Sequence, residues 1–287
     1  MPELPEVEAL TRFLAERTVG RVVASVTVGT ISALKTYAPA PAELAGRTVT
    51  GVTRHGKWLD LATQHGPHLL AHLSRAGWLR WYDVAPATPV RPGKSPIALR
   101  VVLDDGAGFD LTEAGTRKRL AVHIVTDPAE VELVASLGVD PLSDAFTVER
   151  LCALAAARNQ QVKGLLRDQS QVAGIGNAYS DEILHAAKLS PFKPANALDD
   201  AERDTLLGSI QGLLRSAIDR ADGLKPSELK DGKRSGMSVH GRTGEACPVC
   251  GTTIAEVAFA DSSLQYCPGC QTGGKPLADR RLSRLLK

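Results

Sequence analysis

The sequence lacks the features that mark membrane, secreted and strongly charged proteins. No apolar run among its 287 residues approaches the roughly 18 residues that a membrane-spanning helix needs. Its first residues are acidic and contain proline, without the basic segment and apolar core of a signal peptide, so we expect a cytoplasmic protein. Neither charge dominates, because 34 Lys and Arg stand against 32 Asp and Glu. The net charge of +2 permits a polyanionic partner without requiring one.

The hydrophobic pattern present in the chain changes character once. Residues 5–18 carry apolar side chains at helical spacing, and Gly20 is placed to end that helix. From 21 to 125 the chain holds seven or eight short β-segments separated by turn signals, including a hairpin signal at Asp104–Gly106 and a proline-rich loop at 86–96. This pattern is typical of an antiparallel β-sandwich or barrel.

Beyond residue 128 the strands stop and helical periodicity replaces them. We expect helices at 130–137, 148–158, 161–168, 179–188 and 199–221, followed by a hydrophilic loop at 225–236. The fold class predicted is therefore multidomain α+β, with an N-terminal helix and antiparallel β-sandwich, a helical domain and a cysteine module. The expected boundaries are 1–128 for the sandwich, 129–145 for a linker, 146–236 for the helical domain, 237–272 for the cysteine module and 273–287 for a basic tail.

The cysteine module contains two close pairs, Cys247 with Cys250 and Cys267 with Cys270, separated by sixteen residues. This spacing is that of a structural zinc ribbon, and the residues between the pairs can form a hairpin. Two disulfides are the alternative, which a cytoplasmic chain disfavours. Because the protein fills all four positions, we expect one zinc ion that builds structure and takes no part in chemistry.

A glycine turn, Gly174-Ile175-Gly176-Asn177, joins two of the predicted helices. Its glycines let the backbone approach a ligand closely, and the N–H groups that begin the next helix attract anions. It supplies only half of the dinucleotide pattern G-x-G-x-x-G, because Tyr179 occupies the last position and a helix precedes it. A helix pair that contacts a phosphate backbone fits better, with Asn177 donating its side-chain amide. A plain helix-joining turn is the alternative.

The chain begins Met1-Pro2-Glu3-Leu4-Pro5-Glu6-Val7-Glu8. A small second residue favours removal of Met1, which leaves Pro2 with a free secondary amine. An α-amino group titrates near pH ~8, so such an amine is nucleophilic near neutral pH and can form Schiff bases. Glu3 is placed to supply a proton to a leaving group. Taken alone, the stretch is also ordinary chemistry for the start of a helix.

Four separated motifs together resemble one family. They are Pro2–Glu8, His55-Gly56-Lys57-Trp58-Leu59, Gly174–Asn177 and the four-cysteine ribbon, and they follow in the same order and spacing over nearly the whole chain. The chain resembles the formamidopyrimidine-DNA glycosylase/endonuclease VIII family and is identified as a divergent member, nearer the endonuclease VIII side. The resemblance implies a β-sandwich domain, a helix–two-turn–helix domain and a zinc finger, with duplex DNA between the domains.

The resemblance also assigns roles to single residues by position. Pro2 would attack C1′ of the damaged nucleotide, Glu3 would be the general acid, Glu6 a supporting carboxylate, and Lys57 a contact to the phosphate near the flipped nucleotide. Asn177 would bind backbone phosphate. The further DNA contacts expected are Lys163, Arg75, Gly174, Gly176 and Arg242, and the zinc ligands expected are Cys247, Cys250, Cys267 and Cys270.

The implied activity is that of a bifunctional DNA glycosylase/AP lyase. The damaged, oxidised base would leave from a nucleotide extruded from the stack, and Pro2 would hold the opened sugar as an imine. β-Elimination and then δ-elimination would cut the strand. Zinc is the one cofactor expected. The partner expected is double-stranded DNA with damaged bases or abasic sites, bound by a monomer in the cytoplasm at the nucleoid, with no membrane involved.

Four features depart from the family pattern. Ser262 stands where the zinc-finger hairpin usually carries an arginine that grips the lesion phosphates, and a hydroxyl cannot copy a bidentate guanidinium. Arg242 and the basic tail are candidate substitutes. Arg75 stands where the family has a methionine or another bulky side chain that fills the space left by the extruded nucleotide. The Arg-Arg-Phe segment of the formamidopyrimidine branch has no match in 112–119. The loop at 225–236 is short, which removes much of the lid that recognises 8-oxoguanine in that branch.

Two other classes of function are compatible with parts of the sequence. The altered wedge and Ser262 also suit a relative that binds damaged or abasic DNA with weak or absent base excision, and salt-sensitive binding without cleavage would mark it. An N-terminal-proline tautomerase that acts on small keto acids would also use Pro2. That chemistry has no use for a zinc ribbon or a helix pair.

Overall fold

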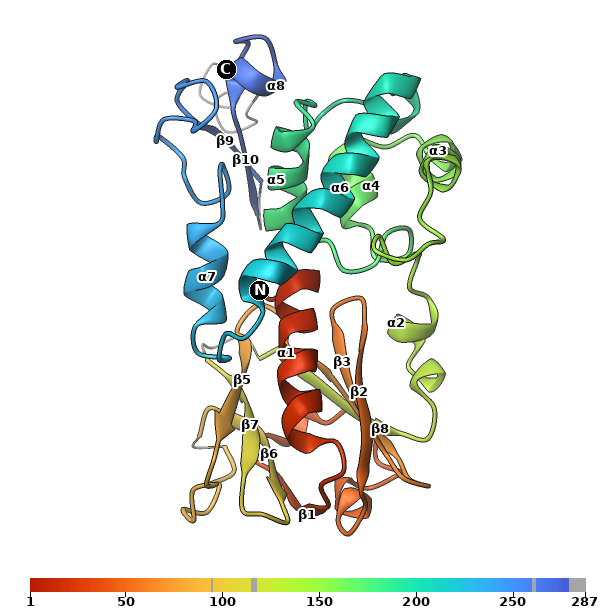
Figure 1. Cartoon of the computed structure of the whole chain (residues 1–287), viewed down its shortest axis with the longest axis vertical. Helices are drawn as coiled ribbons and strands as arrows, with labels where there is room; N and C mark the ends of the chain where they lie inside the picture. Colours follow the sequence, from red (N-terminus) through yellow and green to blue (C-terminus); the bar gives the residue numbers. More distant parts are fainter. Residues whose placement is uncertain (94, 115–117, 260–261, 279–287) are drawn as a thin grey trace. The chain divides into compact units, whose positions relative to one another are not determined.

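The computed structural model describes residues 1–93, 95–114, 118–259 and 262–278. The chain forms two compact units (Figure 1). The sandwich unit contains residues 1–137 and 221–230, and the helical unit contains residues 138–220 and 231–287. The predicted fold class, a β-sandwich with an N-terminal helix followed by helices and a cysteine hairpin, is confirmed. No helix among the described residues is long and apolar enough to cross a membrane.

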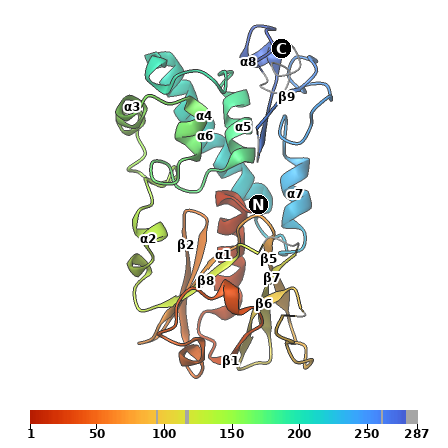
Figure 2. The same ribbon diagram turned by 180° about the vertical axis from the view of Figure 1, so that it is seen from behind.

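Two four-stranded antiparallel sheets form the sandwich. The first has the strand order β1-β6-β7-β5 and the second the order β2-β3-β4-β8. Figure 2 shows the strands of this unit from behind. The predicted hairpin at Asp104–Gly106 joins β6 to β7, and Gly106 takes the positive φ of 83° that its turn requires. The strands are β1 Val23–Val28, β2 Val49–His55, β3 Trp58–Thr63, β4 His68–His72, β5 Gly77–Tyr82, β6 Ile97–Leu103, β7 Gly108–Glu113 and β8 Ala121–Val125.

Helix α1 (Leu4–Thr18) lies against both sheets of its unit. Its Val7, Leu10 and Leu14 are buried in the core that the two sheets share, and the ring of Phe13 lies 5.8 Å from that of Trp81 on β5. Burying these apolar side chains gives the helix its place, because a single helix of this length is marginal in water. The chain start is thereby held at one edge of the sandwich.

The segment 221–230 returns to the sandwich unit after the long helix α6 (Asp200–Ala221). Leu229 is buried in the sandwich core, and Trp78 donates its indole N–H to the carbonyl of Pro226 at 2.8 Å. The expectation of a hydrophilic loop at 225–236 is wrong, since residues Leu229–Ser235 form helix α7. Polar side chains dominate this helix, and its single deeply buried Leu229 gives no helical periodicity to detect.

The helical unit has buried apolar side chains on every long helix. The predicted helices are present, with α2 reduced to one turn and α5 beginning two residues earlier than expected, at Asn177. Two antiparallel strands form the expected hairpin between the cysteine pairs. The helices and hairpin strands are α2 Glu132–Ala135 (in the sandwich unit), α3 Val148–Ala157, α4 Val162–Arg167, α5 Asn177–Ala186, α6, α7, β9 Ala255–Ala258, β10 Ser263–Tyr266 and α8 Pro268–Gln271, with 3₁₀ turns at Ile31–Ala33, Pro41–Leu44, Pro128–Glu130 and Ala195–Ala197.

A buried ion pair spans the first sheet. Arg100 on β6 donates from Nε and Nη2 to the two carboxylate oxygens of Asp110 on β7, at 2.7 and 2.9 Å. Asp110 has no solvent exposure and also accepts from the hydroxyl of Tyr82. The Asp110 contacts raise the pKa of Arg100 and outweigh its burial, so the guanidinium stays charged. Arg100 also donates to the carbonyls of Pro86 and Thr88, which fixes the start of the proline-rich loop.

Replacing Asp110 should therefore cost more than the hydrogen bonds alone. We expect Asp110→Asn to lower the free energy of unfolding of the sandwich by about 3–5 kcal/mol, because it leaves a buried guanidinium without its counter-charge. Urea unfolding followed by tryptophan fluorescence measures this loss. Asp104→Asn, at an exposed position in the adjoining turn, is the matched control and should change stability by less than about 0.5 kcal/mol. Equal effects of the two substitutions would contradict the role of the ion pair.

Candidate active site and zinc module

The chain start leads directly into α1, with Glu3 as the N-cap residue. Pro2, Glu3 and Glu6 are all buried, and Glu6 accepts the backbone N–H of Glu3 at 2.8 Å through Oε2. Glu6 therefore has a structural function as a cap for the helix start, beside any role in chemistry. The positive end of the helix dipole favours carboxylates here and disfavours a positively charged amine. The geometry suits an uncharged amine next to an acidic side chain.

Lys57 lies in the turn between β2 and β3, and β2 packs against α1. Gly56 and Lys57 form a two-residue hairpin between the paired residues His55 and Trp58, and Gly56 supplies the positive φ of 56°. Arg54, on the strand before the turn, donates Nε to the Glu8 carboxylate on α1 at 2.8 Å. Glu8 belongs to the N-terminal motif, and this ion pair explains its presence there. It fixes α1 against the strand that leads into the Lys57 turn.

His72 lies at the end of β4 and was not recognised from the sequence as a site residue. It is paired across the sheet with Trp58, the neighbour of Lys57, and its ring centroid lies 4.9 Å from that of Trp58. The pKa of His72 is lowered to about 4, first because burial penalises the charged imidazole and second because the Lys57 ammonium repels it. At neutral pH the pair therefore has one positive charge, on Lys57. A lone histidine that closes a strand before a tight loop was the signal available in the sequence.

The tight loop that follows His72 presents Arg75 to solvent. Arg75 is exposed, and Gly77 donates its N–H back to the carbonyl of Leu73 at 2.8 Å. A side chain at Gly77 would lie only 2.1 Å from that carbonyl oxygen, so the loop requires glycine there. The loop thus holds an exposed arginine in the sandwich unit. Within the segment 112–119, which was compared with the family's Arg-Arg-Phe segment, residues 115–117 lie outside the described residues.

The glycine turn leads directly into α5. Gly174 has a φ of 92°, and its N–H donates to Oε1 of Gln169, whose Nε2 in turn donates to the carbonyl of Ile175. The Gln169 side chain therefore already occupies the N–H of Gly174. Gly176 is the N-cap residue of α5. The anion-attracting end of the helix is set by this turn.

Asn177 makes a contact that the sequence did not indicate. Its Nδ2 donates to the backbone carbonyl of Ser263 at 2.7 Å, so it joins α5 to strand β10 of the cysteine hairpin. Its Oδ1 is buried and has no hydrogen-bond partner among the described residues. Ser263 directly follows Ser262, whose carbonyl accepts the N–H of Phe259 at the hairpin turn. Asn177, expected to bind phosphate, is thus bonded to the residue that follows Ser262, where the family's arginine is missing.

Lys163 is buried instead of lying on the surface. Its Nζ donates to Oδ1 of Asp181 at 2.5 Å and to the hydroxyl of Ser180 at 2.8 Å. Asp181 has no side-chain exposure, and its other oxygen accepts from Nδ1 of His240 at 2.7 Å. Two cationic or polar partners thus offset the cost of burying this carboxylate. The network connects α4, α5 and the segment that leads into the cysteine module.

Glu182, the neighbour of Asp181, binds the backbone of that segment. Its carboxylate accepts three successive N–H groups, from Ser238, Val239 and His240, at 2.7–2.9 Å. Glu182 itself is 3% exposed. Hydrogen bonds to a charged group contribute about 1.5–3 kcal/mol each, so this is a strong connection between α5 and the cysteine module.

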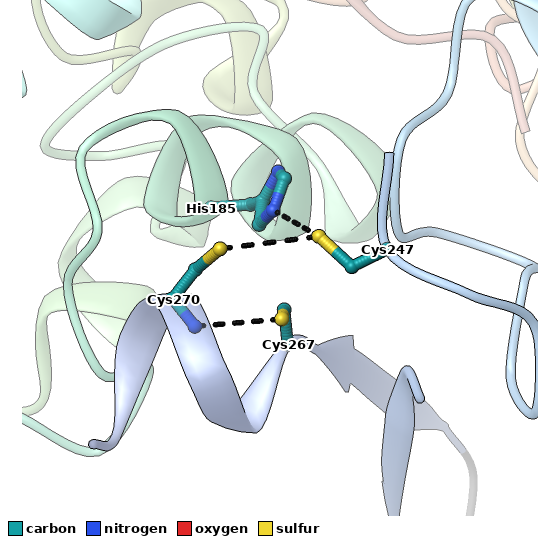
Figure 3. A group of neighbouring side chains, drawn as sticks. All are labelled: His185, Cys247, Cys267 and Cys270. Atoms are coloured by element: carbon teal, nitrogen blue, oxygen red, sulfur yellow. Dashed lines mark hydrogen bonds between the residues drawn. The ribbon is translucent and has the colours of Figure 1, made fainter. Parts of the chain in front are cut away.

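The cysteine sulfurs lie close enough together to bind one metal ion. Cys247 Sγ is 3.9 Å from Cys270 Sγ, and Cys250 Sγ is 3.3 Å from Cys267 Sγ. Four thiolates around zinc at about 2.3 Å would be about 3.8 Å apart, and these two separations lie near that value. His185 on α5 adds a donor, and its ligand atom lies within 4.8 Å of the sulfurs of Cys247, Cys267 and Cys270 (Figure 3).

Arg242, a candidate substitute for the missing arginine, forms an ion pair. Its Nε lies 2.7 Å from Glu245, and its side chain is about one third exposed. Of the basic tail, residues 279–287 lie outside the described residues, and Leu277 donates its N–H to the hydroxyl of Tyr266 on β10. The beginning of the tail is therefore packed on the hairpin.

Three family descriptions match this chain in succession. They are the formamidopyrimidine-DNA glycosylase N-terminal domain over residues 1–122, the formamidopyrimidine-DNA glycosylase H2TH domain over 137–227, and a zinc finger found in FPG and IleRS over 244–273. Among curated proteins, the formamidopyrimidine-DNA glycosylase of Symbiobacterium thermophilum is 37% identical over 298 residues, with 98% of this chain and 93% of that protein covered. An uncharacterized formamidopyrimidine-DNA glycosylase-like protein of Mycobacterium tuberculosis is 52% identical over 152 residues, 53% of this chain and 95% of that protein.

Solved structures give the same result. The crystal structure of the MutM (Fpg) protein from Thermus thermophilus has a TM-score of 0.81 and 30% identity, and covers 96% of this chain and 100% of that one. A complex between the Lactococcus lactis Fpg and DNA that contains an abasic site has a TM-score of 0.81 and 27% identity, and covers 94% of this chain and 99% of that one.

The Lys57–His72 pair generates a pH prediction. Because the pKa of His72 is lowered in the folded protein, protonation favours the unfolded chain. The free energy of unfolding should be unaffected above the ordinary value of about 6.5 and should fall towards pH ~4, by on the order of 2–3 kcal/mol. This acid-induced loss should be absent in His72→Gln, measured by urea unfolding at stepped pH.

An NMR titration separates the two causes of the low His72 pKa, burial and the charge of Lys57. Lys57→Gln should raise the pKa of His72 from about 4 and still leave it below 6.5, because burial is the larger cause. Lys35→Gln is the control, since Lys35 acts on the pKa of His123 instead. A wild-type pKa for His72 at or above the ordinary 6.5 would contradict this account.

The contacts of Glu182 generate a second prediction. Glu182→Gln should sharply reduce hydrogen-exchange protection at residues 238–240, because an amide cannot accept three N–H groups as a carboxylate does. We expect the local opening free energy to fall by about 2–4 kcal/mol. Glu149→Gln, at an exposed position on α3, is the control and should leave protection unchanged. Unaltered protection at 238–240 in Glu182→Gln would count against the inferred role.

Proposed function

Because the chain belongs to the formamidopyrimidine-DNA glycosylase family, we propose that it removes damaged bases with Pro2 as the nucleophile and then cleaves the abasic strand. The protein is a DNA glycosylase/AP lyase, and its partner is DNA with damaged bases or abasic sites. The observation that carries the residue assignment is the buried first turn of α1. It combines Pro2, Glu3 and Glu6 at a helix N-terminus, and Arg54, on the strand before the Lys57 turn, is paired with Glu8 of the same helix.

The proposed chemistry uses few groups. After Met1 is removed, the Pro2 amine forms a bond to C1′ of the extruded nucleotide while the bond from C1′ to the base breaks. Glu3 supplies the proton needed by the departing base or the opening ring. The C1′–O4′ bond then breaks and O4′ takes up a proton, which leaves an iminium ion between Pro2 and C1′. This iminium acidifies the neighbouring C–H, so loss of that proton eliminates the 3′ phosphate, and a second elimination removes the 5′ phosphate. Glu6 keeps the helix start in place through the Glu3 N–H.

Lys57 and His72 are proposed to hold the phosphate beside the reacting sugar. Lys57 provides the positive charge, and His72, kept neutral by burial and by Lys57, provides a hydrogen-bonding ring. Arg75, exposed on its loop, is proposed to enter the space that the extruded nucleotide leaves. These contacts position the DNA and carry no information on base identity.

The helical unit and the zinc ribbon are proposed to bind the DNA backbone, with Gly174, Gly176, Asn177 and Arg242 as contacts. The chain holds one structural zinc, and the ligands proposed are Cys247, Cys250, Cys267 and Cys270. Bound zinc supplies structural stability to the ribbon and takes no part in the reaction. Lys163 is proposed to act through Asp181, as a buried support for the start of α5, and no longer as a direct contact.

Three finer assignments belong to the same proposal. The functional division follows the predicted boundaries, with catalysis in 1–128, DNA binding in 146–236 and zinc in 237–272. The protein acts in the cytoplasm at the nucleoid, where its substrate lies. Its lesion preference resembles that of the endonuclease VIII side, because Arg75 and Ser262 depart from the formamidopyrimidine pattern.

Borohydride trapping tests the nucleophile. Mature protein mixed with abasic duplex DNA and borohydride should give a covalent complex, and tandem mass spectrometry should place the link at residue 2. Pro2→Gly should lose most strand cleavage, and Glu3→Gln should lose base excision by roughly 10²–10⁴-fold. Pro5→Ala, which removes another proline from the same helix turn, is the matched control and should be trapped like the wild type.

Two results would overturn the proposal. Trapping at Lys57 with undiminished cleavage by Pro2→Gly would assign the reaction to another amine. Salt-sensitive binding to damaged DNA without trapping or cleavage on abasic, oxidised-pyrimidine and oxidised-purine substrates would make the chain a damage-binding protein instead.

A further inference from the structure

His185 differs from the other described histidines because its ring nitrogen contacts a cysteine sulfur of the zinc module. It is on α5, 6% exposed, and its Nε2 lies 3.3 Å from Cys247 Sγ. Its ligand atom and the sulfurs of Cys247, Cys267 and Cys270 all lie within 4.8 Å of one another. Figure 3 shows the imidazole pointing from the helix towards these three sulfurs. A complete Cys₃His donor set is therefore present beside the four-cysteine set.

The position of His185 is fixed by the helix that carries it. Asn177, Asp181 and His185 occur at every fourth residue, so they lie on one face of α5. All three contact the zinc module or the segment that leads into it, through the carbonyl of Ser263, the ring of His240 and the sulfur of Cys247. Glu182 adds three backbone hydrogen bonds from the same helix. This helix face is thus held against the ribbon independently of any metal.

The four cysteines differ in how well the protein encloses them. Cys247 and Cys267 are buried, and Cys270 is partly buried, whereas Cys250 is exposed. Cys267 is held further, because its N–H donates to Oε1 of Gln271, whose Nε2 donates to the carbonyl of Leu189 in the helical part of the unit. Cys250, the cysteine that the Cys₃His set does not include, is thus the most exposed of the four.

From this arrangement we propose that His185 is a reserve zinc ligand, which replaces the exposed Cys250 and completes a site with Cys247, Cys267 and Cys270. Imidazole nitrogen is a common zinc donor beside thiolate, and Cys₃His is an established structural ligand set in proteins. While Cys250 binds the metal, His185 stays next to the sulfur of Cys247. When Cys250 is unavailable, a small shift of the metal towards α5 restores four donors. The ribbon then keeps its zinc, and its fold, after losing one thiolate.

The test uses the full chain and measures zinc, not activity. Four variants are compared: Cys250→Ser, His185→Gln, the two combined, and Cys267→Ser. Zinc content is measured by atomic emission after dialysis against a chelator. Cys250→Ser should keep close to the wild-type zinc content, whereas the double variant and Cys267→Ser should lose most of it. Chelator-induced zinc release should be at least about tenfold faster in the double variant than in Cys250→Ser.

Cobalt substitution reports the donor atoms directly. Co²⁺-loaded Cys250→Ser should show weaker thiolate-to-metal charge-transfer bands than wild type and d–d bands at higher energy, as one nitrogen replaces one sulfur. The shift should vanish when His185→Gln is added. Circular dichroism of every variant separates metal loss from unfolding, and His185→Gln alone should keep its zinc. Zinc loss from Cys250→Ser as complete as from Cys267→Ser, or a cobalt spectrum of Cys250→Ser that does not depend on His185, would overturn the proposal.

Discussion

The carboxylate of Glu182 carries the architecture of the helical unit. It is buried on α5 and satisfied by three consecutive backbone N–H groups of residues 238–240, which precede the cysteine ribbon. Next to it, Asp181 is neutralised by Lys163 and bonded to His240. Buried charges of this kind are costly unless every oxygen is paired, so they permit one arrangement of helix and ribbon and penalise others. The zinc module is consequently positioned by carboxylates as well as by its metal.

The sequence was sufficient for the parts of the fold that repeat a pattern. Alternating apolar strands, the helical periodicity of α6 and the cysteine spacing each arise from one local rule, and the structure confirms the elements they predict. Helix α7 was missed because only one of its side chains, Leu229, is deeply buried, so its sequence has no apolar periodicity. Leu229 is buried in the core of the sandwich unit, which is formed mostly by residues distant from it in sequence. Tertiary packing, and not periodicity, decides such a helix.

The candidate site divides along similar lines. The N-terminal motif and the zinc cysteines could be identified because their residue types are themselves unusual in that spacing. His72 could not be identified, because its low pKa results from burial and from the charge of Lys57. Only the pairing of β3 with β4 brings Lys57 near it. The partners of Asn177, Lys163 and His185 lie 86, 18 and 62 residues away in the chain, so no local pattern reports them. Glu8 illustrates the opposite case, because a residue of the N-terminal motif turns out to secure the helix through Arg54.

The return of residues 221–230 to the sandwich has a consequence for how the protein can be divided. The chain passes between the two units three times, near residues 137, 220 and 230. A proteolytic cut at the first passage would leave residues 1–137 without a covalent link to 221–230, the segment that packs in the same unit. A fragment that ends at residue 137 would lack Leu229 and the Pro226 carbonyl that Trp78 binds, leaving a gap in its core. The two units are thus products of one continuous fold, and neither corresponds to a single stretch of the gene.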